Sequence, residues 1–545
     1  MKKQQEYILY ILLFIFSFIC YRNTLAISFL SDDYSYLFQF HEFGIRSLFH
    51  NFGESHLRTL SGLINYAIYA CAGMESWPFH AVALAIHTLN AILLFQLVVK
   101  YQPFHVASAA AVLFLVLPYQ TEAVVWMAAS AYLYATFFLL LAANGYAIYL
   151  KHRENQKRAW ALTLFFLSLL CKEIGLGFIA LPLLIEYIIP SSQSNKRLKF
   201  QGLMITLGLA IAYASTRYFI LGSLVGGYGA EVHLKASLPL LMYNVGCYLA
   251  KFFLDYRYIP IVIRVFVKHH HMLSTLVLCI VLALALYKLK HKLHTKSALL
   301  ILCLFLLSLG PVINLETSFL GDIQSDRYGY LPSLVFVYLV AIGLGTMIQR
   351  KLTYYMVISS IGIIYVIQTN ITNQAWIKSG QIADNLLAAM AKVQPATQPV
   401  YIINLPDNYN GAYTFRCNFP EAVQLHFPSW EHIQVKGLVF QHITNLNVPW
   451  ITSQQATGST AATFSLPMNK DETENDFIDV NPKLDLPSPN NPIRKLEVTK
   501  TCVKLYMNPQ ANKSQANNPQ DKNNQPRIFI YTGQELIPCP LPTIL

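Results

Sequence analysis

Apolar runs about as long as a membrane-spanning helix recur between residues 7 and 370, and they restrict the fold more than any other feature of the sequence. A helix needs about 20 consecutive, mostly apolar residues to cross the hydrocarbon core of a bilayer. Charged residues make up 12% of the chain, against about 25% in soluble globular domains, and the mean hydropathy is +0.39. The composition therefore excludes an ordinary water-soluble fold and predicts an all-α polytopic membrane protein.

The distribution of Lys and Arg predicts how the chain threads the membrane. Residues from Gln374 onward carry thirteen basic and thirteen acidic side chains, so the whole net charge of +12 lies in residues 1–373. There the basic clusters flank apolar runs, as in cytoplasmic loops, and do not form the single basic stripe typical of nucleic-acid binding. We therefore expect a cytoplasmic amino terminus, an uncleaved first span and an outer loop at residues 30–80. About eleven transmembrane helices are expected, at residues 7–29, 81–99, 105–118, 130–150, 159–171, 174–190, 200–221, 272–287, 297–316, 329–349 and 353–370.

One apolar stretch, residues 238–267, leaves the topology open. A single crossing there would place the basic "KLKHKLHTK" outside and the acidic "GDIQSDR" inside, against the positive-inside rule. The charge pattern favours a re-entrant or surface helix pair, and the count of eleven spans depends on that choice.

The region after residue 373 has a different composition, which predicts an extracytoplasmic domain of mixed α/β or β-rich structure at residues 374–545. The runs "VYIINLP", "GLVFQHITNL" and "RIFIYTG" have the pattern of buried strands. Residues 508–526, rich in Asn, Gln and Pro, are expected to be disordered. Cys417, Cys502 and Cys539 share this outer domain, and their pairing stays open.

Two adjacent carboxylates, Asp32 and Asp33, follow the first apolar run in "FLSDDYSYLFQF". One interpretation is structural, because Asp is a favoured helix N-cap residue. A cap needs only one carboxylate, however, and charge next to lipid usually has a partner or a function. The second interpretation is that one of the pair acts as a general base.

Further charged residues are expected at the same outer face. They are Arg58 in "SHLRTLSG", Glu122 in "LPYQTEAVVWM", Lys172 and Glu173 in "LLCKEIGLGF", and Arg327 in "GDIQSDRYGYLPS". Each residue alone is best explained as part of a salt bridge. Together they predict a cavity that binds the phosphate of an anionic lipid. Arg327 is expected to be exposed, so that its replacement would alter folding little.

The order of these segments resembles the membrane core of GT-C glycosyltransferases, most of all the transmembrane-and-TPR O-mannosyltransferases and their bacterial relatives, and more distantly the protein O-mannosyltransferases. Over residues 7–376, Asp32-Asp33 matches the acidic pair of the family's first outer loop. "HTLNAIL" matches its "H-x-x-N-x-x-L", "LPYQTEAVVW" its "H-P-x-H-x-E-A-V-A-W", "CKEIGL" its "K-E" element and "DRYGYLPS" its "E-R-Y-L-Y-L-P-S".

The chain also departs from that pattern at several positions. Thr59 stands where the family has proline, Tyr119 and Gln120 where it commonly has histidine, and Asp326 where it has glutamate. No TPR repeats follow the membrane core. These differences leave the acceptor undetermined.

The resemblance implies an inverting hexosyltransferase in the bacterial inner membrane that takes a sugar from a polyprenyl-phosphate donor at the outer face. It implies that a carboxylate of Asp32 or Asp33 accepts the proton of the acceptor hydroxyl. The Asp-then-Glu order in the family favours Asp32 as base and Asp33 as helper. Lys172 and Arg327 would stabilise the leaving lipid phosphate, and Glu122 would orient a protein or glycan acceptor or hold a divalent cation. No cofactor is predicted with certainty, and the metal stays unknown.

Two other functions fit the composition. Intramembrane ion pairs also mark the substrate paths of transporters, so a flippase for a lipid-linked saccharide is an alternative. Against it, the sequence has no internal repeat and its polar residues are expected at one face of the membrane. A non-catalytic scaffold that displays residues 374–545 is the third candidate, and for such a scaffold the acidic pair would be dispensable.

Overall fold

The structure is a computed structural model, and it divides the chain into two compact units. The described residues are 2–49, 57–179, 196–222, 325–393 and 399–443, with single positions and short pieces between 241 and 313, residue 446, and strands between 453 and 538. The first unit holds Met1–Leu25 and Phe43–Asn373, and the second holds Ala26–Glu42 and Gln374–Leu545. One boundary thus falls between residues 373 and 374, where the composition changes. Residues 26–42 belong to the second unit. The sequence had assigned residues 26–29 to the end of the first span and residues 30–42 to the outer loop of the membrane domain.

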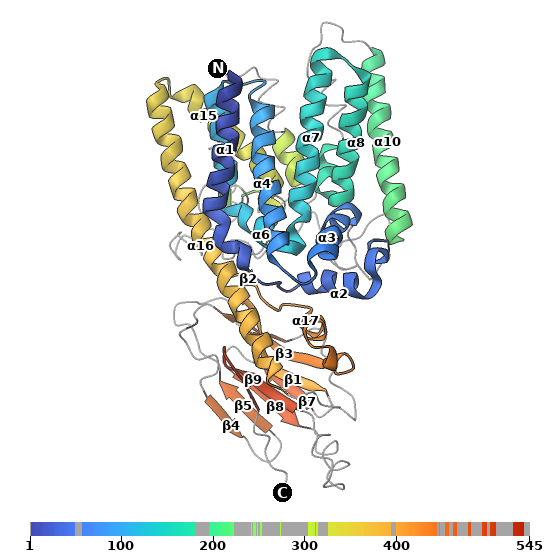
Figure 1. The fold of residues 1–545 in the computed structure, drawn as a ribbon, viewed down its shortest axis with the longest axis vertical. Helices are drawn as coiled ribbons and strands as arrows, with labels where there is room; N and C mark the ends of the chain where they lie inside the picture. Colours follow the sequence, from blue (N-terminus) through green and yellow to red (C-terminus); the bar gives the residue numbers. More distant parts are fainter. Residues whose placement is uncertain are drawn as a thin grey trace. The chain divides into compact units, whose positions relative to one another are not determined.

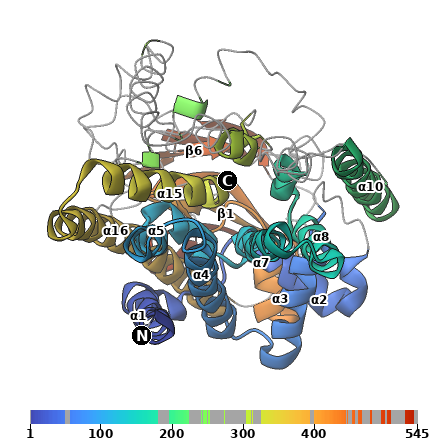
Figure 2. The same ribbon diagram turned by 90° about the horizontal axis from the view of Figure 1, so that it is seen from above.

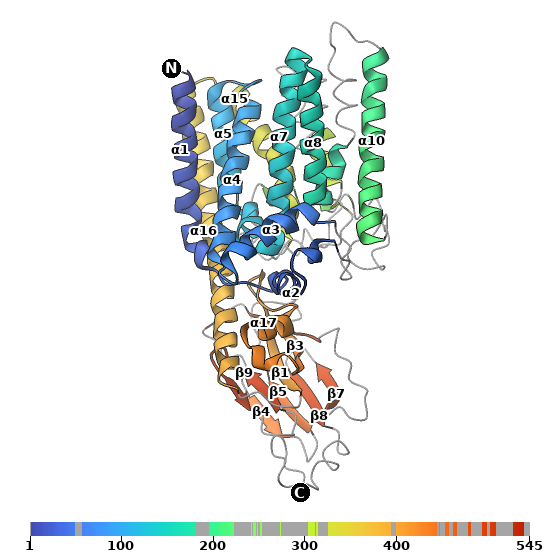
Figure 3. The ribbon, with the colours of Figure 1, turned by 45° about the vertical axis from the view of Figure 1, so that its right-hand side comes forward.

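The first unit consists of long helices that run side by side (Figures 1 and 3). Their bounds are α1 Lys2–Tyr21, α4 Trp77–Val98, α5 Phe104–Val116, α7 Ala131–His152, α8 Asn155–Cys171, α10 Lys196–Leu221 and α15 Tyr330–Met347. Shorter helices are α3 Thr59–Ala72 and α6 Thr121–Val125, with 3-10 turns η5 Glu173–Phe178 and η7 Asp326–Gly329. The helix α16, Lys351–Ala391, contributes residues to both units.

Several of these helices are long and apolar enough to cross a membrane. Among the described residues there are six, beginning at Lys3, Trp77, Met127, Phe200, Asp326 and Lys351, and up to seven if the bent pair formed by Phe104–Val116 and Pro118–Val125 is one span. The predicted spans 81–99, 130–150, 200–221 and 329–349 agree with α4, α7, α10 and α15 to within a few residues. Most of residues 238–267 and all but one of residues 272–287 lie outside the described part, so the count of eleven stays a prediction.

Helix α4 occupies the middle of the first unit, where it packs against α1, α5 and α7, and α5 packs in turn against α15 (Figure 2). Buried polar side chains join these helices. Nε2 of His87 donates to the carbonyl of Leu115 at 3.1 Å, so Nδ1 accepts from the Tyr330 hydroxyl at 2.8 Å. The amide of Asn90 donates to the same hydroxyl at 3.1 Å. The "H-x-x-N" segment therefore locks α4 to α15, because polar groups within a membrane must find partners inside the protein.

The second unit contains two β-sheets, and the three runs that the sequence predicted as strands all lie in the larger one. In the larger sheet β1 (Val400–Tyr409) lies parallel to both β3 (Val435–Ile443) and β9 (Arg527–Tyr531). Its edges are antiparallel: β10 (Leu536–Pro538), β6 (Ile478–Val480) and the short β2 (Ala412–Tyr413). All ten residues of β1 are buried, which explains why "VYIINLP" is almost wholly apolar. The smaller sheet is antiparallel, in the order β4 (Ser453–Ala456), β5 (Ala461–Ser465), β8 (Cys502–Met507), β7 (Ile493–Val498).

Helix α17, Phe419–His426, packs on β3, and the end of α16 reaches β1 and β9. Lys378 donates to the Tyr409 hydroxyl at 3.3 Å, and the Tyr531 hydroxyl lies 3.4 Å from the carbonyl of Ile382. Residues 508–526, where disorder was predicted, lie outside the described residues. The expected sheet structure of the C-terminal region is present.

Residues 26–42 are tied to this unit by close contacts. Gly380 of α16 leaves no room for a side chain, since a Cβ there would lie 3.2 Å from Cγ2 of Ile27 and 3.4 Å from the backbone nitrogen of Ser28. The backbone nitrogen of Ser31 donates to the carbonyl of Thr414 at 2.8 Å. Helix α2, Asp33–Phe43, therefore starts from a segment that is packed against the C-terminal region.

Candidate functional site

The first group of candidate residues centres on a bidentate pair between Glu122 in α6 and Arg327 in η7. One carboxylate oxygen of Glu122 accepts from the backbone nitrogen of Arg327 at 2.7 Å, and the other accepts from its guanidinium. The guanidinium also lies over two rings, 5.3 Å from the centroid of Trp126 and 4.7 Å from that of Tyr328. Glu122 is 1% exposed and Arg327 12%. The pair is therefore a buried, geometrically fixed one.

A second ion pair adjoins the first. Nζ of Lys251 lies 2.6 Å from Oδ1 of Asp326, and the same ammonium lies 5.3 Å from the ring centroid of Tyr119. Asp326 is next to Arg327 in the chain and follows Ser325, whose φ of 70° places it in the left-handed region. That conformation is uncommon for a residue other than glycine. It turns the chain sharply just before the two charged side chains.

The third pair lies between neighbours in the sequence, at the end of α8. Nζ of Lys172 is 3.8 Å from Oε2 of Glu173 and 5.7 Å from the ring centroid of Tyr132. The Tyr132 ring packs edge-on against Tyr328, with centroids 5.8 Å apart, and Arg327 lies over Tyr328. Two aromatic rings therefore connect Lys172 with Arg327.

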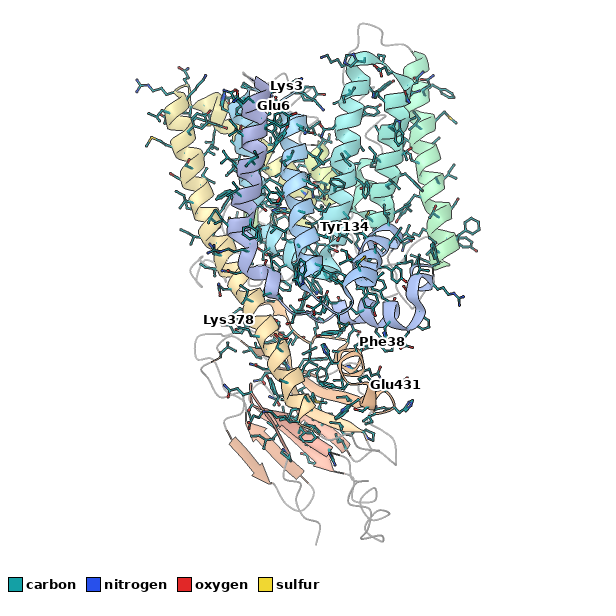
Figure 4. All side chains as sticks on the ribbon, viewed as in Figure 1. Lys3, Glu6, Phe38, Tyr134, Lys378 and Glu431 are labelled. Atoms are coloured by element: carbon teal, nitrogen blue, oxygen red, sulfur yellow. The ribbon has the colours of Figure 1, made fainter. Side chains whose placement is uncertain are left out.

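Arg58 precedes α3 and reaches the same region through its backbone. The hydroxyl of Ser61 lies 3.1 Å from the carbonyl of Arg58 and 3.0 Å from that of Cys171, the residue before Lys172. All five residues that the sequence suggested for phosphate binding thus lie on neighbouring elements of the first unit. Arg58 lies just before α3 and Glu122 lies in α6. Lys172 and Glu173 follow α8, and Arg327 lies in η7, which directly precedes α15. Figure 4 labels Tyr134 in the first turns of α7, which begins in the same part of the unit.

One expectation from the sequence needs correction here. Arg327 is not a surface arginine, because it is largely buried and both oxygens of Glu122 bind it. The role expected for Glu122 toward an acceptor or a metal stays a prediction, since each carboxylate oxygen can accept a second bond. The sequence also missed Lys251, since its segment offered no recognisable motif. Its charge within an apolar stretch was the one signal that pointed to it.

The acidic pair belongs to the second unit, and its two members have different surroundings. Oδ1 of Asp32 lies 2.7 Å from Sγ of Cys417 and 3.4 Å from Nδ2 of Asn418. Asp32 is half-buried, and its carbonyl accepts from the backbone nitrogens of Ser35 and Tyr36, so it stands just before α2. Among the described residues, the side chain of Asp32 is hydrogen-bonded to residues 417 and 418 and not to the first turn of α2.

Asp33 is 1% exposed, and its Oδ2 accepts from the backbone nitrogen of Leu30 at 3.0 Å. The backbone nitrogen of Asp33 returns a bond to the carbonyl of Leu30 at 2.9 Å. Asp33 thus closes the turn that precedes α2, so the structural interpretation fits Asp33. Asp32 keeps a more open carboxylate and is the better candidate for a base.

The next turn of α2 contacts α17. Tyr34 stacks on Phe415, with centroids 5.9 Å apart, and its hydroxyl lies 3.5 Å from Nε2 of His426. Burial raises the pKa of Tyr34, and the carboxylates of Asp384 and Asp33 raise it further. Burial lowers the pKa of His426, and Asp384 opposes that shift. His426 therefore binds Tyr34 as a neutral ring at pH 7.

No group of three or more His, Cys, Asp or Glu side chains is arranged to hold a metal ion within the described part of the chain. Cys417 is a free thiol in the structure. The side chain of Cys502 and the whole of Cys539 lie outside the described residues, so the pairing question stays open for them.

Comparison with known proteins gives matches among solved structures alone. No family model matches, and no curated protein matches. ArnT from Cupriavidus metallidurans bound to undecaprenyl phosphate is similar over 79% of this chain and 92% of its own, with 10% identity and a TM-score of 0.47. The apo state of the same protein gives a TM-score of 0.46. The oligosaccharyltransferase of Archaeoglobus fulgidus is similar over 78% of this chain and 62% of its own, with 11% identity and a TM-score of 0.44.

These structures are GT-C glycosyltransferases, the superfamily that the motifs resemble. The identities are near 10% and the TM-scores are below 0.5. What the chain does is therefore inferred below from its side chains.

Proposed function

We propose that this membrane protein transfers a sugar from a polyprenyl-phosphate donor to an acceptor hydroxyl, with inversion at the anomeric carbon. The observation that carries the proposal is the group of three cations, Lys172, Lys251 and Arg327, gathered around buried aromatic rings in the first unit. The donor class and the inverting chemistry come from the resemblance of the motifs. The acceptor and the identity of the sugar are not part of the proposal.

In this proposal the cations bind the phosphate and stabilise the charge that develops on it as the glycosidic bond breaks. Buried guanidinium and ammonium groups act strongly because little water screens them. Glu122 holds Arg327 by two bonds, which fixes the direction of the remaining N–H groups. Arg58, which lies just before α3, is a fourth basic residue on a neighbouring element of the same unit, and guanidinium groups bind phosphate oxygens well.

Asp32 is the proposed base. Its carboxylate would accept the proton of the acceptor hydroxyl as the oxygen attacks the anomeric carbon, and the lipid phosphate would leave with the bonding electrons. A base in that role typically contributes about 10² to 10⁴-fold to the rate. Asp33, which is bound to the backbone of Leu30, supports the turn and does not take part in proton transfer.

The test uses purified full-length protein in lipid nanodiscs, with a polyprenyl-phosphate hexose as donor and the release of polyprenyl phosphate as readout. Asp32→Asn preserves the shape but cannot accept the proton, so turnover should fall by about 10² or more with donor binding retained. Glu431→Gln, an exposed carboxylate in the second unit, is the matched control and should keep normal turnover. Wild-type turnover in Asp32→Asn would overturn the proposed base.

The same protein in sealed vesicles distinguishes the transporter. Movement of the lipid-linked sugar across the bilayer without release of lipid phosphate would favour a flippase and reject the transferase. A scaffold would show neither activity and would tolerate Asn at both aspartates.

A further inference from the structure

The carboxylate of Asp32 is held by residues that lie 385 and 386 positions further along the chain. Sγ of Cys417 is 2.7 Å from Oδ1, and Nδ2 of Asn418 is 3.4 Å from the same oxygen. These residues come from the segment "YTFRCNFPE", to which the sequence assigned no role. Asp32, Cys417 and Asn418 all belong to the second unit, so this contact is internal to one compact body.

The direction of each hydrogen bond follows from the groups involved. An ionised carboxylate only accepts, so the single proton of the Cys417 thiol points to Oδ1 of Asp32. The hydroxyl of Ser31, 3.2 Å from Sγ, must then donate to the sulfur, and the amide of Asn418 approaches the sulfur at 3.3 Å. The two donors that surround the thiol thus help to orient its proton.

The two oxygens of Asp32 are consequently unequal. Oδ1 receives the bonds from residues 417 and 418, whereas no hydrogen bond from a described residue reaches Oδ2. A base that takes a proton from a substrate needs this division, because one oxygen fixes the orientation of the carboxylate and the other meets the substrate.

The segment that carries the thiol is itself anchored firmly. The hydroxyl of Ser379 in α16 donates to the carbonyl of Tyr413 at 2.6 Å and lies 2.7 Å from the hydroxyl of Thr414. The carbonyl of Thr414 accepts from Ser31, the residue before Asp32. Ser31 and Asn418 both have left-handed φ values, 47° and 60°, on either side of the contact. Such conformations persist where the surrounding structure enforces them.

We propose that Cys417 and Asn418 are positioning residues for Asp32, so that the C-terminal region completes the catalytic base of the transferase. The inference rests on the function proposed above. Catalytic groups need to be held to within about 0.5 Å and 10–20° of their working geometry. A carboxylate at the start of α2 with no donor to Oδ1 would rotate about its side-chain bonds, and misplacement of about 1 Å can cost about 10²-fold in rate.

The experiment compares Cys417→Ser with Cys417→Ala in the full-length enzyme, using the same release assay. Serine retains one proton to donate, and alanine retains none. Cys417→Ala should lower kcat about 10-fold or more with KM for the donor unchanged, because the proposal assigns donor binding to the cations and not to Asp32. Cys417→Ser should recover most of that loss. Cys71→Ala, the loss of an exposed thiol in the first unit, is the matched control and should leave both constants unchanged.

Asn418→Gly provides a second test that does not depend on the folding of the alanine variant. Glycine adopts a φ of 60° without strain, so the backbone is preserved while the amide is removed. This variant should also lower kcat and leave KM unchanged. If Cys417→Ala and Asn418→Gly both keep the wild-type kcat, or if Ser is no better than Ala, the inference is wrong.

A double-mutant cycle separates this inference from the proposed function. If Cys417 acts through Asp32, adding Cys417→Ala to Asp32→Asn should cause no further loss, whereas independent effects would multiply. An inactive Asp32→Asn together with fully active Cys417→Ala and Asn418→Gly would reject the positioning role alone. A fully active Asp32→Asn would reject the proposed base, and the positioning role with it.

Discussion

At the scale of single residues, the structure separates two aspartates that have the same chemistry. Asp33 is buried and bound to the backbone of Leu30, whereas Asp32 is half-buried and bound by a thiol and an amide. The difference arises because Asp33 closes a turn within its own segment and Asp32 faces a segment from the far end of the chain. The chemical behaviour of a carboxylate therefore depends on its hydrogen-bond partners and burial, and two aspartates need not have the same role.

The pair of Glu122 and Arg327 leads to a prediction about both stability and activity. Arg327→Gln would leave the carboxylate of Glu122 buried without its cation, and breaking a buried ion pair typically costs about 3–5 kcal/mol. We expect a lower melting temperature in detergent, together with weak use of the donor lipid. This differs from the small effect on folding that an exposed arginine would have.

A double variant separates the two effects. Glu122→Gln combined with Arg327→Gln replaces the ion pair by two neutral amides, so most of the stability should return. Release of lipid phosphate should stay low, because the phosphate still lacks Arg327. Arg327→Lys should restore only part of it, since an ammonium cannot reproduce the fork of a guanidinium. Full activity of the double variant would remove Arg327 from the phosphate site.

At the scale of helices and strands, side chains in the interior of each unit set the packing. In the first unit the hydroxyl of Tyr330 links α15 to His87 and Asn90 of α4. In the second unit Tyr34 of α2 packs against His426 of α17 and the loop at Phe415. In both cases one tyrosine joins elements that are far apart in the sequence, and its hydroxyl lies within hydrogen-bond distance of a histidine ring.

Tyr330→Phe tests the hydrogen bonds that link α4 to α15. The ring would still pack, but Nδ1 of His87 would lose its donor and the amide of Asn90 one of its two acceptors, since it also donates to the carbonyl of Leu133. A buried polar group left without a partner costs about 1–3 kcal/mol, so we expect a clear loss of thermal stability in detergent. Tyr338→Phe is the control, because the hydroxyl of Tyr338 on the same helix accepts from the side chain of Gln102, its one hydrogen-bond partner within the described part of the chain. Equal melting temperatures for both variants would show that the hydrogen bonds of the Tyr330 hydroxyl do not contribute to thermal stability.

At the scale of the whole molecule, the chain is an integral membrane protein with at least six helices suited to crossing a bilayer among its described residues, and with a sheet-containing unit built mainly from its C-terminal third. Residues 26–42 leave the first unit and join the second. The candidate base is therefore folded with the C-terminal region, and the candidate phosphate-binding residues are folded with the helices. A C-terminal region of this kind is expected to matter for activity and not only for attachment.

The positions of the two ends of α16 relative to the membrane test the predicted topology. Cysteines introduced at Arg350 and at Asn385, in a Cys71→Ala background, should react differently with a maleimide that cannot cross membranes. Arg350 should be protected in intact cells because it is predicted to be cytoplasmic. Asn385, which is exposed and lies in the part of α16 assigned to the second unit, should be labelled from outside. Labelling of Arg350 alone would reverse the topology and place the predicted site on the cytoplasmic side.

The sequence by itself determined the membrane class, the positions of α4, α7, α10 and α15, and the strands β1, β3 and β9, because hydropathy and its period are local properties of the chain. It also singled out Glu122, Lys172 and Arg327, since charge in an apolar context stands out without any structure. Only the tertiary structure decided the partners. Glu122 and Arg327 are 205 positions apart, and Asp32 and Cys417 are 385 apart. No local pattern encodes such contacts, because they depend on how helices and strands pack after they have formed. That packing assigned Asp33 to a turn and left Asp32 with one open oxygen.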